Sequence, residues 1–164
     1  MAKRGESRKS SESVDDYLKA IYHLSGEEQR RVGSSELAVR LDVAPASITN
    51  MLQKLAAERR PFIDYERGKG VRLSAVGKKR ALEIVRHHRL IETFLFEVLG
   101  YPIGELHEEA ERLEHFISER FEERVAARLG NPEVDPHGHC IPSLDGVMPK
   151  GHGETCGCGR PEAQ

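Results

Sequence analysis

The sequence predicts a mainly α-helical protein, in which an N-terminal winged helix-turn-helix is followed by a second helical domain. Three observations support this fold class: two short helical segments joined by a tight turn, two short strands with a basic turn directly after them, and further helical segments that carry half of the histidines. With 164 residues, of which 38% are hydrophobic, the chain suits one compact domain or two small ones.

The net charge of −2 conceals two halves of opposite charge. Residues 1–80 carry 17 Lys and Arg against 11 Asp and Glu, whereas residues 81–164 carry 8 against 16 and hold seven of the eight histidines. A basic half suits phosphate, and an acidic half rich in histidine suits a metal or a protein. No apolar run could span a bilayer, and the polar start does not resemble a secretory signal. All three cysteines lie in the last quarter, which does not suit a disulfide framework. For these reasons we expect a cytoplasmic protein.

The first elements are short helices. Residues 1–11 are basic and polar, and we expect them to be disordered. Apolar residues at helical spacing predict a helix in "SVDDYLKAIYHLS", and a second helix, "SSELAVRL", is expected to begin at capping serines. After the connector "DVA", Pro45 opens a third helix, "PASITNMLQKLAAE". This pair is typical of a helix-turn-helix, although such pairs also occur in proteins that do not bind DNA.

A short hairpin follows the helix pair. "FIDYE" and "VRLS" predict two strands joined by "RGKG", a turn rich in cations that are well placed to meet a phosphate backbone. The second helix of the pair should enter the major groove, with its first polar side chains nearest the base edges and Lys54 nearer phosphate. The residues expected to contact DNA are Ser35, Pro45, Ser47, Thr49, Asn50, Lys54, Arg67, Lys69 and Arg72.

The second half offers ligands for a metal ion. A helix from Ala75 to about Leu99, capped by Ser74, carries His88 and Glu92 four residues apart, which makes them neighbours on one face. In "HEEAERLEH" the possible ligands His107, Glu111, Glu114 and His115 fall within an arc of about 100° on a helix. Charge of this density is also compatible with a solvated helix face. However, Ala110, Leu113, Phe116 and Ile117 predict an adjoining apolar face, so we expect the ligands at the edge of a core.

Together these segments resemble the diphtheria-toxin-repressor and manganese-transport-regulator family of metal-dependent transcriptional repressors. The resemblance covers residues 12–147 and is carried by "DYLKAIYHL", "VAPASITNMLQKL", "GVRLSAVGKKRA", "RHHRLIETFL", "HEEAERLEH" and "DPHGHCIP". It implies a winged helix-turn-helix domain over 12–74 and a helical metal-binding and dimerisation domain over 75–147. It also implies a homodimer that binds palindromic operator DNA when loaded with a divalent metal.

The resemblance assigns two metal sites. The family's principal site falls on Asp16, Glu111, Glu114 and His115, and its second site on His88, Glu92 and His107. Asp16 also has a simpler reading, because Ser13 and Asp16 match a helix capping box. If Asp16 is a ligand, the shared cation joins the DNA-binding half to the dimerisation half and fixes the spacing of the two recognition helices.

Two departures limit what the resemblance implies. Lys19 stands where manganese-specific members place another acidic ligand. The larger iron-responsive members end in a small barrel domain that adds ligands to the second site, whereas this sequence ends in a tail, residues 148–164, that we expect to be flexible. Its His152, Cys156 and Cys158 are possible ligands for a soft metal.

The residues also bear on the metal and on rival functions. Iron-responsive relatives have Met and Cys where this chain has Asp16 and Glu111, and hard oxygen ligands favour Mn²⁺, with Fe²⁺ as the alternative. A metalloenzyme is the more remote alternative, but neither the zinc pattern H-x-x-E-H nor the paired Glu-x-x-His of di-iron bundles fits, and we expect no enzyme. A third possibility is a winged-helix protein that binds DNA without metal.

Overall fold

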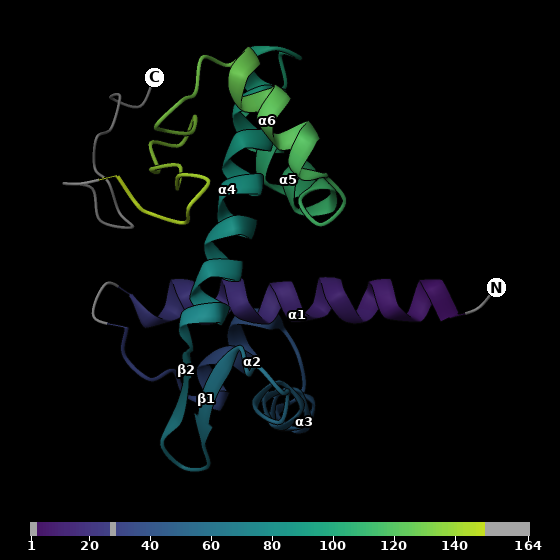
Figure 1. Cartoon of the computed structure of the whole chain (residues 1–164), viewed down its shortest axis with the longest axis vertical. Coiled ribbons are helices and arrows are strands. Elements are labelled where there is room, and N and C mark those ends of the chain that lie inside the picture. The colour runs from purple at the N-terminus through teal and green to yellow at the C-terminus, as the bar shows by residue number, and fades with distance from the viewer. Residues whose placement is uncertain (1–2, 27–28, 150–164) are drawn as a thin grey trace. The chain divides into compact units, whose positions relative to one another are not determined.

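The computed structural model describes residues 3–26 and 29–149, and the chain forms two compact units, one up to Ala81 and one from Leu82 (Figure 1). The division falls inside helix α4 (Ala75–Glu97), a few residues after the boundary at 74 that we expected. Among the described residues, no helix has both the length and the apolar character of a membrane span.

The first unit is the predicted winged helix-turn-helix. It contains α1 (Lys3–Ser25), α2 (Ser34–Leu41), α3 (Pro45–Ala56) and a hairpin of β1 (Ile63–Glu66) and β2 (Gly70–Leu73). Apolar residues from all of these elements form its core because each helix turns one hydrophobic face inward. The largest of these buried side chains are Leu18, Ile21, Val32, Leu37, Ile48, Leu52, Leu55 and Val71.

Helix α1 begins earlier than expected. It starts at Lys3, so that residues 3–11, for which we expected disorder, are its first turns. The high charge of this segment suggested disorder, but the residues that carry the charge, Lys, Arg and Glu, are also good helix formers. Ser13 and Asp16 therefore lie inside the helix, and the reading of Asp16 as part of a capping box is wrong.

The short helices differ from the prediction in one detail of capping. Gly33, rather than a serine, is the N-cap of α2, and its backbone N–H donates to Glu36 Oε2 at 2.7 Å. Pro45 opens α3 as predicted. Ser74 caps α4 as predicted, because its Oγ accepts from the backbone N–H of Gly77 at 3.1 Å. A side chain at Gly77 would place its Cβ 1.9 Å from the carbonyl oxygen of Phe62, so only glycine fits this contact.

The wing hairpin is held by the segment between α1 and α2, to which the sequence analysis assigned no role. β1 and β2 are antiparallel, and Val32 pairs with Val71 of β2 through backbone hydrogen bonds of 2.7 and 2.9 Å. The guanidinium of the preceding Arg31 donates to Asp64 Oδ2 at 2.7 Å and to Glu66 Oε1 at 2.8 Å. It also donates to the carbonyl of Gly70 at 3.1 Å. Arg31 therefore ties both wing strands to the body of the unit.

The second unit packs two short helices against the remainder of α4. These are α5 (Leu106–Leu113), preceded by the 3₁₀ turn η1 (Ile103–Glu105), and α6 (Glu119–Arg128). One core cluster joins Ile91 and Leu95 of α4 to Leu106 and Ala110 of α5. A second cluster joins α4 to α6 and to the irregular segment after it, and contains Leu90, Val125, Ala126 and Ile141.

Part of the expected apolar burial is wrong. Helix α5 ends at Leu113, and Glu114 is its C-cap, so "HEEAERLEH" is not one continuous helix. Ala110 is buried as expected, but Leu113 is 38% exposed and Phe116 48% exposed. Val98 follows the end of α4 and is also exposed. The predicted apolar stripe thus divides between a core and a surface.

Candidate metal centre and nucleic-acid interface

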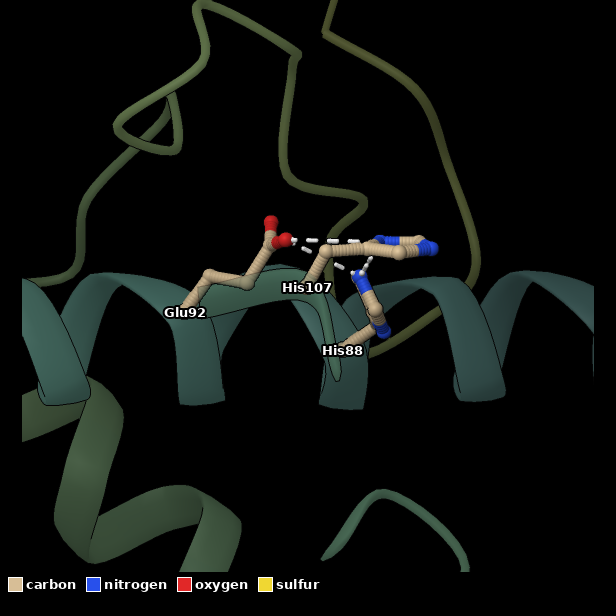
Figure 2. Close-up of side chains that lie close together, drawn as sticks. All are labelled: His88, Glu92 and His107. Atoms are coloured by element: carbon tan, nitrogen blue, oxygen red, sulfur yellow. Dashed lines mark hydrogen bonds and ion pairs between the residues drawn. The ribbon is translucent and has the colours of Figure 1, made fainter. Parts of the chain in front are cut away.

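Three of the predicted ligands meet in the second unit (Figure 2). His88 and Glu92 lie one turn apart on α4, and His107 comes from the first turn of α5. His88 Nε2 lies 3.1 Å from Glu92 Oε1 and 3.1 Å from His107 Nδ1, and His107 Nδ1 lies 3.7 Å from Glu92 Oε1. Two imidazoles and a carboxylate at this separation are suitable ligands for a divalent transition metal.

The other edge of the His88 ring faces a second group of ligands. Its Nδ1 donates to Glu114 Oε2 at 2.5 Å and lies 3.9 Å from Glu111 Oε1. The side chain of Glu114 is fully buried, whereas Glu111 lies at the surface edge with 37% of its side chain exposed. His88 therefore stands between two ligand groups, one on each side of its ring.

The carboxylates around His88 change its affinity for a proton. Burial disfavours the charged imidazolium, but hydrogen bonds to Glu114 and Glu92, together with their negative charges, outweigh burial and raise the pKa of His88 to about 9. The protonated imidazole of His88 thus supplies a positive charge between these carboxylates. Any metal that uses His88 must displace that proton.

The remaining predicted ligands lie in different units. His115 follows Glu114, and its Nε2 lies 3.5 Å from Glu114 Oε1, so these two are together in the second unit. Asp16 belongs to α1 in the first unit. Its part in the principal site therefore stays a prediction. Within the described part of the second unit, the structure brings the remaining ligands of the two predicted sites into neighbouring positions.

One residue near the site was missed by the sequence analysis. His137, in the turn "DPHGHC", brings Nε2 to 3.5 Å from Glu92 Oε1. Buried Asp135 organises this turn, because its Oδ1 accepts from the backbone N–H groups of His137 and His139 at 2.8 and 2.9 Å. The spacing of Asp135, His137 and His139 within five residues was a signal for this contact. The predicted metal-binding residues His152, Cys156 and Cys158 lie outside the described residues.

The predicted DNA-reading face is accessible in the first unit. Ser35 of α2 and the side chains of Pro45, Ser47, Asn50 and Lys54 on α3 are exposed. Thr49 is half-buried, and its hydroxyl donates to the carbonyl of Pro45 at 3.1 Å, so it is less available to a base than Asn50. The apolar face of α3, with Ile48, Leu52 and Leu55, is in the core, which leaves the polar face outward.

The wing carries less free positive charge than its cations suggest. Arg67, Lys69 and Arg72 are all exposed. Lys69 Nζ, however, lies 2.6 Å from Glu66 Oε2, and Arg72 Nε donates to Asp64 Oδ2 at 2.8 Å. The carboxylates of β1, which the sequence analysis did not weigh, neutralise part of the wing. Arg67 at the turn has no ion pair within the described part of the chain.

The chain is similar to several known proteins. Two family models match it: the N-terminal DNA-binding domain of iron-dependent repressors over residues 9–71 and their metal-binding and dimerisation domain over residues 74–143. The iron-dependent repressor IdeR of Mycobacterium tuberculosis is 33% identical over 133 residues, which are 81% of this chain and 56% of that protein. The HTH-type transcriptional regulator MntR of Oceanobacillus iheyensis is 37% identical over 106 residues, 65% of this chain and 69% of the regulator.

A solved structure described as a manganese-dependent transcriptional repressor in complex with manganese is also similar. It has a TM-score of 0.75 and 41% sequence identity, and the match covers 83% of this chain and 61% of that one. The chain thus spans little more than half the length of the mycobacterial relative and less than two thirds of this structure.

Proposed function

Because this chain belongs to the iron-dependent repressor family, whose two domain models together match most of its length, we propose that it is a metal-dependent transcriptional regulator. It binds palindromic operator DNA as a homodimer when loaded with a divalent cation, and represses metal-uptake genes from the cytoplasm. The observation that carries this function is the double ligand group around His88, in the same chain as an exposed recognition helix. The family is one of transcriptional repressors, and we propose no catalytic activity.

The donor set fits a divalent metal. Glu114 is a fully buried carboxylate whose charge a proton on His88 offsets, and a buried charge of this kind needs a cation or a positive partner. We assign the second site to His88, Glu92 and His107. The principal site is assigned to Glu111, Glu114 and His115 of the second unit, with Asp16 of the first unit as its fourth ligand. The cation supplies a positive charge that carboxylates from both units share.

That sharing is the proposed switch. Asp16 lies on the helix that packs against the helix-turn-helix, so a bond to Asp16 restrains the first unit relative to the second. In a homodimer, this restraint sets the distance between the two α3 helices, and operator half-sites lie at a fixed spacing along the groove. The metal shifts the equilibrium toward the DNA-competent state by a free energy equal to the difference between its binding free energies for the two states.

The surface of the second unit supports the proposed dimer. Several large apolar side chains near the end of α4 and around α5 and α6 are exposed, which is costly for a surface that stays in water. They belong to the unit whose family model is a metal-binding and dimerisation domain. We place the contact with a second copy of the chain on this surface, which includes Phe96, Val98, Leu99, Ile103, Leu113, Phe116 and Phe121.

The proposed metal is Mn²⁺, with Fe²⁺ as the alternative. Asp16 and Glu111 are hard oxygen donors, which suit Mn²⁺. The similar manganese-dependent repressor structure supports this assignment, whereas the iron-dependent relative supports Fe²⁺. Later transition metals bind nitrogen and oxygen sites more tightly than Mn²⁺, so tight binding does not identify the activating ion. The test is which ion, at a controlled free concentration, activates DNA binding.

The experiment for the proposed function measures DNA binding by fluorescence anisotropy, using a palindromic fragment from the promoter of a metal-uptake gene. With Mn²⁺ the protein should bind as a dimer, and a chelator should release it. By linkage, operator DNA should tighten Mn²⁺ binding by the same factor. Equal affinity with and without chelator would overturn the switch and favour a winged-helix protein that binds DNA without metal. Activation by anaerobic Fe²⁺ at concentrations where Mn²⁺ is inactive would overturn the manganese assignment.

A further inference from the structure

A second buried histidine lies beside the metal centre and is not one of its ligands. His87 precedes His88 on α4, and only about 4% of it is exposed. Its Nδ1 lies 3.2 Å from the backbone carbonyl oxygen of Glu114, and its Nε2 lies 3.0 Å from Glu122 Oε2 on α6. The ring therefore connects the end of α5 and the first turn of α6 to α4.

Both ring nitrogens of His87 lie within hydrogen-bond distance of an oxygen atom. A backbone carbonyl can only accept, so Nδ1 must carry a proton. Burial opposes ionisation of Glu122, but hydrogen bonds from His87 and Arg86 outweigh it and hold the pKa of Glu122 below its ordinary value. This carboxylate is thus an acceptor beside the ring, with Oε2 3.0 Å from His87 Nε2. Arg86 Nε donates to the other oxygen, Glu122 Oε1, and so fixes the carboxylate in place.

The accepting carbonyl belongs to the peptide group that joins Glu114 to His115. Orienting this one peptide plane orients two adjacent residues, and both are ligands in the proposed function. Glu114 is the C-cap of α5, after which the chain leaves the helix, so the helix alone does not determine the direction of this peptide.

From these contacts we infer that His87, braced by Glu122, is a positioning residue for the metal ligands Glu114 and His115. The inference rests on the proposed function, because it needs these two residues to be ligands. Removing a group that orients a metal ligand commonly lowers metal affinity by about 10- to 100-fold. His87 would act in this way through a backbone carbonyl rather than through a side chain.

The test compares purified full-length variants with Mn²⁺ and Co²⁺ as the probe ions. His87→Asn retains one short amide donor and cannot reach both acceptors, so Mn²⁺ affinity should fall about 10- to 100-fold. The visible spectrum of bound Co²⁺, which reports ligand geometry, should change. His87→Arg supplies several donors and should restore the wild-type spectrum. Glu122→Gln keeps the size and shape of the side chain that contacts His87, so it should change the Co²⁺ spectrum less than His87→Asn does. It also serves as a second variant if His87→Asn does not fold.

Thr93→Val is the matched control, because it removes a buried hydrogen bond on the same helix, from Thr93 Oγ1 to the carbonyl of Arg89 at 2.7 Å. It should lower the melting temperature of the metal-free protein and leave the Co²⁺ spectrum unchanged. If the His87 variants likewise lose only melting temperature and keep the wild-type spectrum and affinity, the inference is overturned and the proposed function stands. Wild-type protein that binds neither ion would overturn both.

Discussion

Competition between a proton and the metal at His88 gives a quantitative prediction. The pKa of His88 in the metal-free protein is about 9, raised by Glu114 and Glu92 against the effect of burial. At pH 7 a metal that uses His88 must therefore displace a proton held two pKa units above the solution pH. This lowers the apparent affinity about 100-fold, or by roughly 3 kcal/mol.

The sign of the pH dependence follows from the same numbers. Apparent affinity for Mn²⁺ should rise about tenfold per pH unit from pH 7 and level off near the pKa of about 9, with one proton released for each metal bound at this site. A histidine of ordinary pKa would give a nearly flat profile over this range. The pKa of His88 is higher in the folded than in the unfolded chain. Protonation of His88 therefore also stabilises the metal-free protein. This contribution is fully present when the pH is below the ordinary pKa of histidine and is lost as the pH rises toward 9.

Calorimetric titration of anaerobic protein with Mn²⁺, repeated in buffers of different ionisation enthalpy between pH 7 and pH 8.5, measures both affinity and released protons. Glu114→Gln should reduce proton release, because it removes the closest acceptor of His88, at 2.5 Å. Glu123→Gln, an exposed carboxylate on α6, is the control and should behave like wild type. Affinity that does not change with pH, without proton release, would refute the reasoning.

Three further predictions concern the DNA-binding unit. Arg67→Ala should weaken binding to every DNA sequence and lower the salt slope by about one unit, whereas Asn50→Ala should reduce the preference for particular bases at one or two base pairs. Competition titrations at several salt concentrations distinguish the two effects. Loss of base preference in Arg67→Ala and uniform weakening in Asn50→Ala would mean that the unit docks on DNA in another way. Arg31→Met should weaken DNA binding and leave Mn²⁺ affinity unchanged, because it removes the hydrogen bonds that hold both wing strands; equal DNA affinity would contradict this role. Gly77→Ala should destabilise the protein by about 1–3 kcal/mol in chemical denaturation, because its Cβ would overlap the Phe62 carbonyl; an unchanged midpoint would contradict the close contact.

The sequence was informative wherever one residue type has one strong local meaning. Pro45 at a helix start and Ser74 as a cap were predicted correctly, because both preferences are local. His88 and Glu92 were recognised as a pair because a spacing of four residues makes neighbours on any helix. For these residues, the element and the face could be deduced before any tertiary contact was known.

The remainder depended on contacts between distant segments. Nothing local distinguishes Arg31 from an ordinary charged loop residue, since its partners on the wing strands lie more than 30 residues later. His87 and His137 were overlooked for the same reason, because their partners come from other elements or from turns. The start of α1 was missed because charge density was read as a sign of disorder in a segment with high helix propensity.

The internal ion pairs of the wing affect how this protein would search a chromosome. Non-specific attraction to DNA grows with the number of phosphates that a protein neutralises, and each contact contributes a salt slope of about 0.9. Asp64 and Glu66 already occupy Arg31, Lys69 and Arg72, so a random DNA segment must compete with carboxylates of the protein itself. A wing of this kind adds less to the attraction that all DNA sequences share, so contacts to base edges from α3 would supply a larger share of the binding free energy at a specific site.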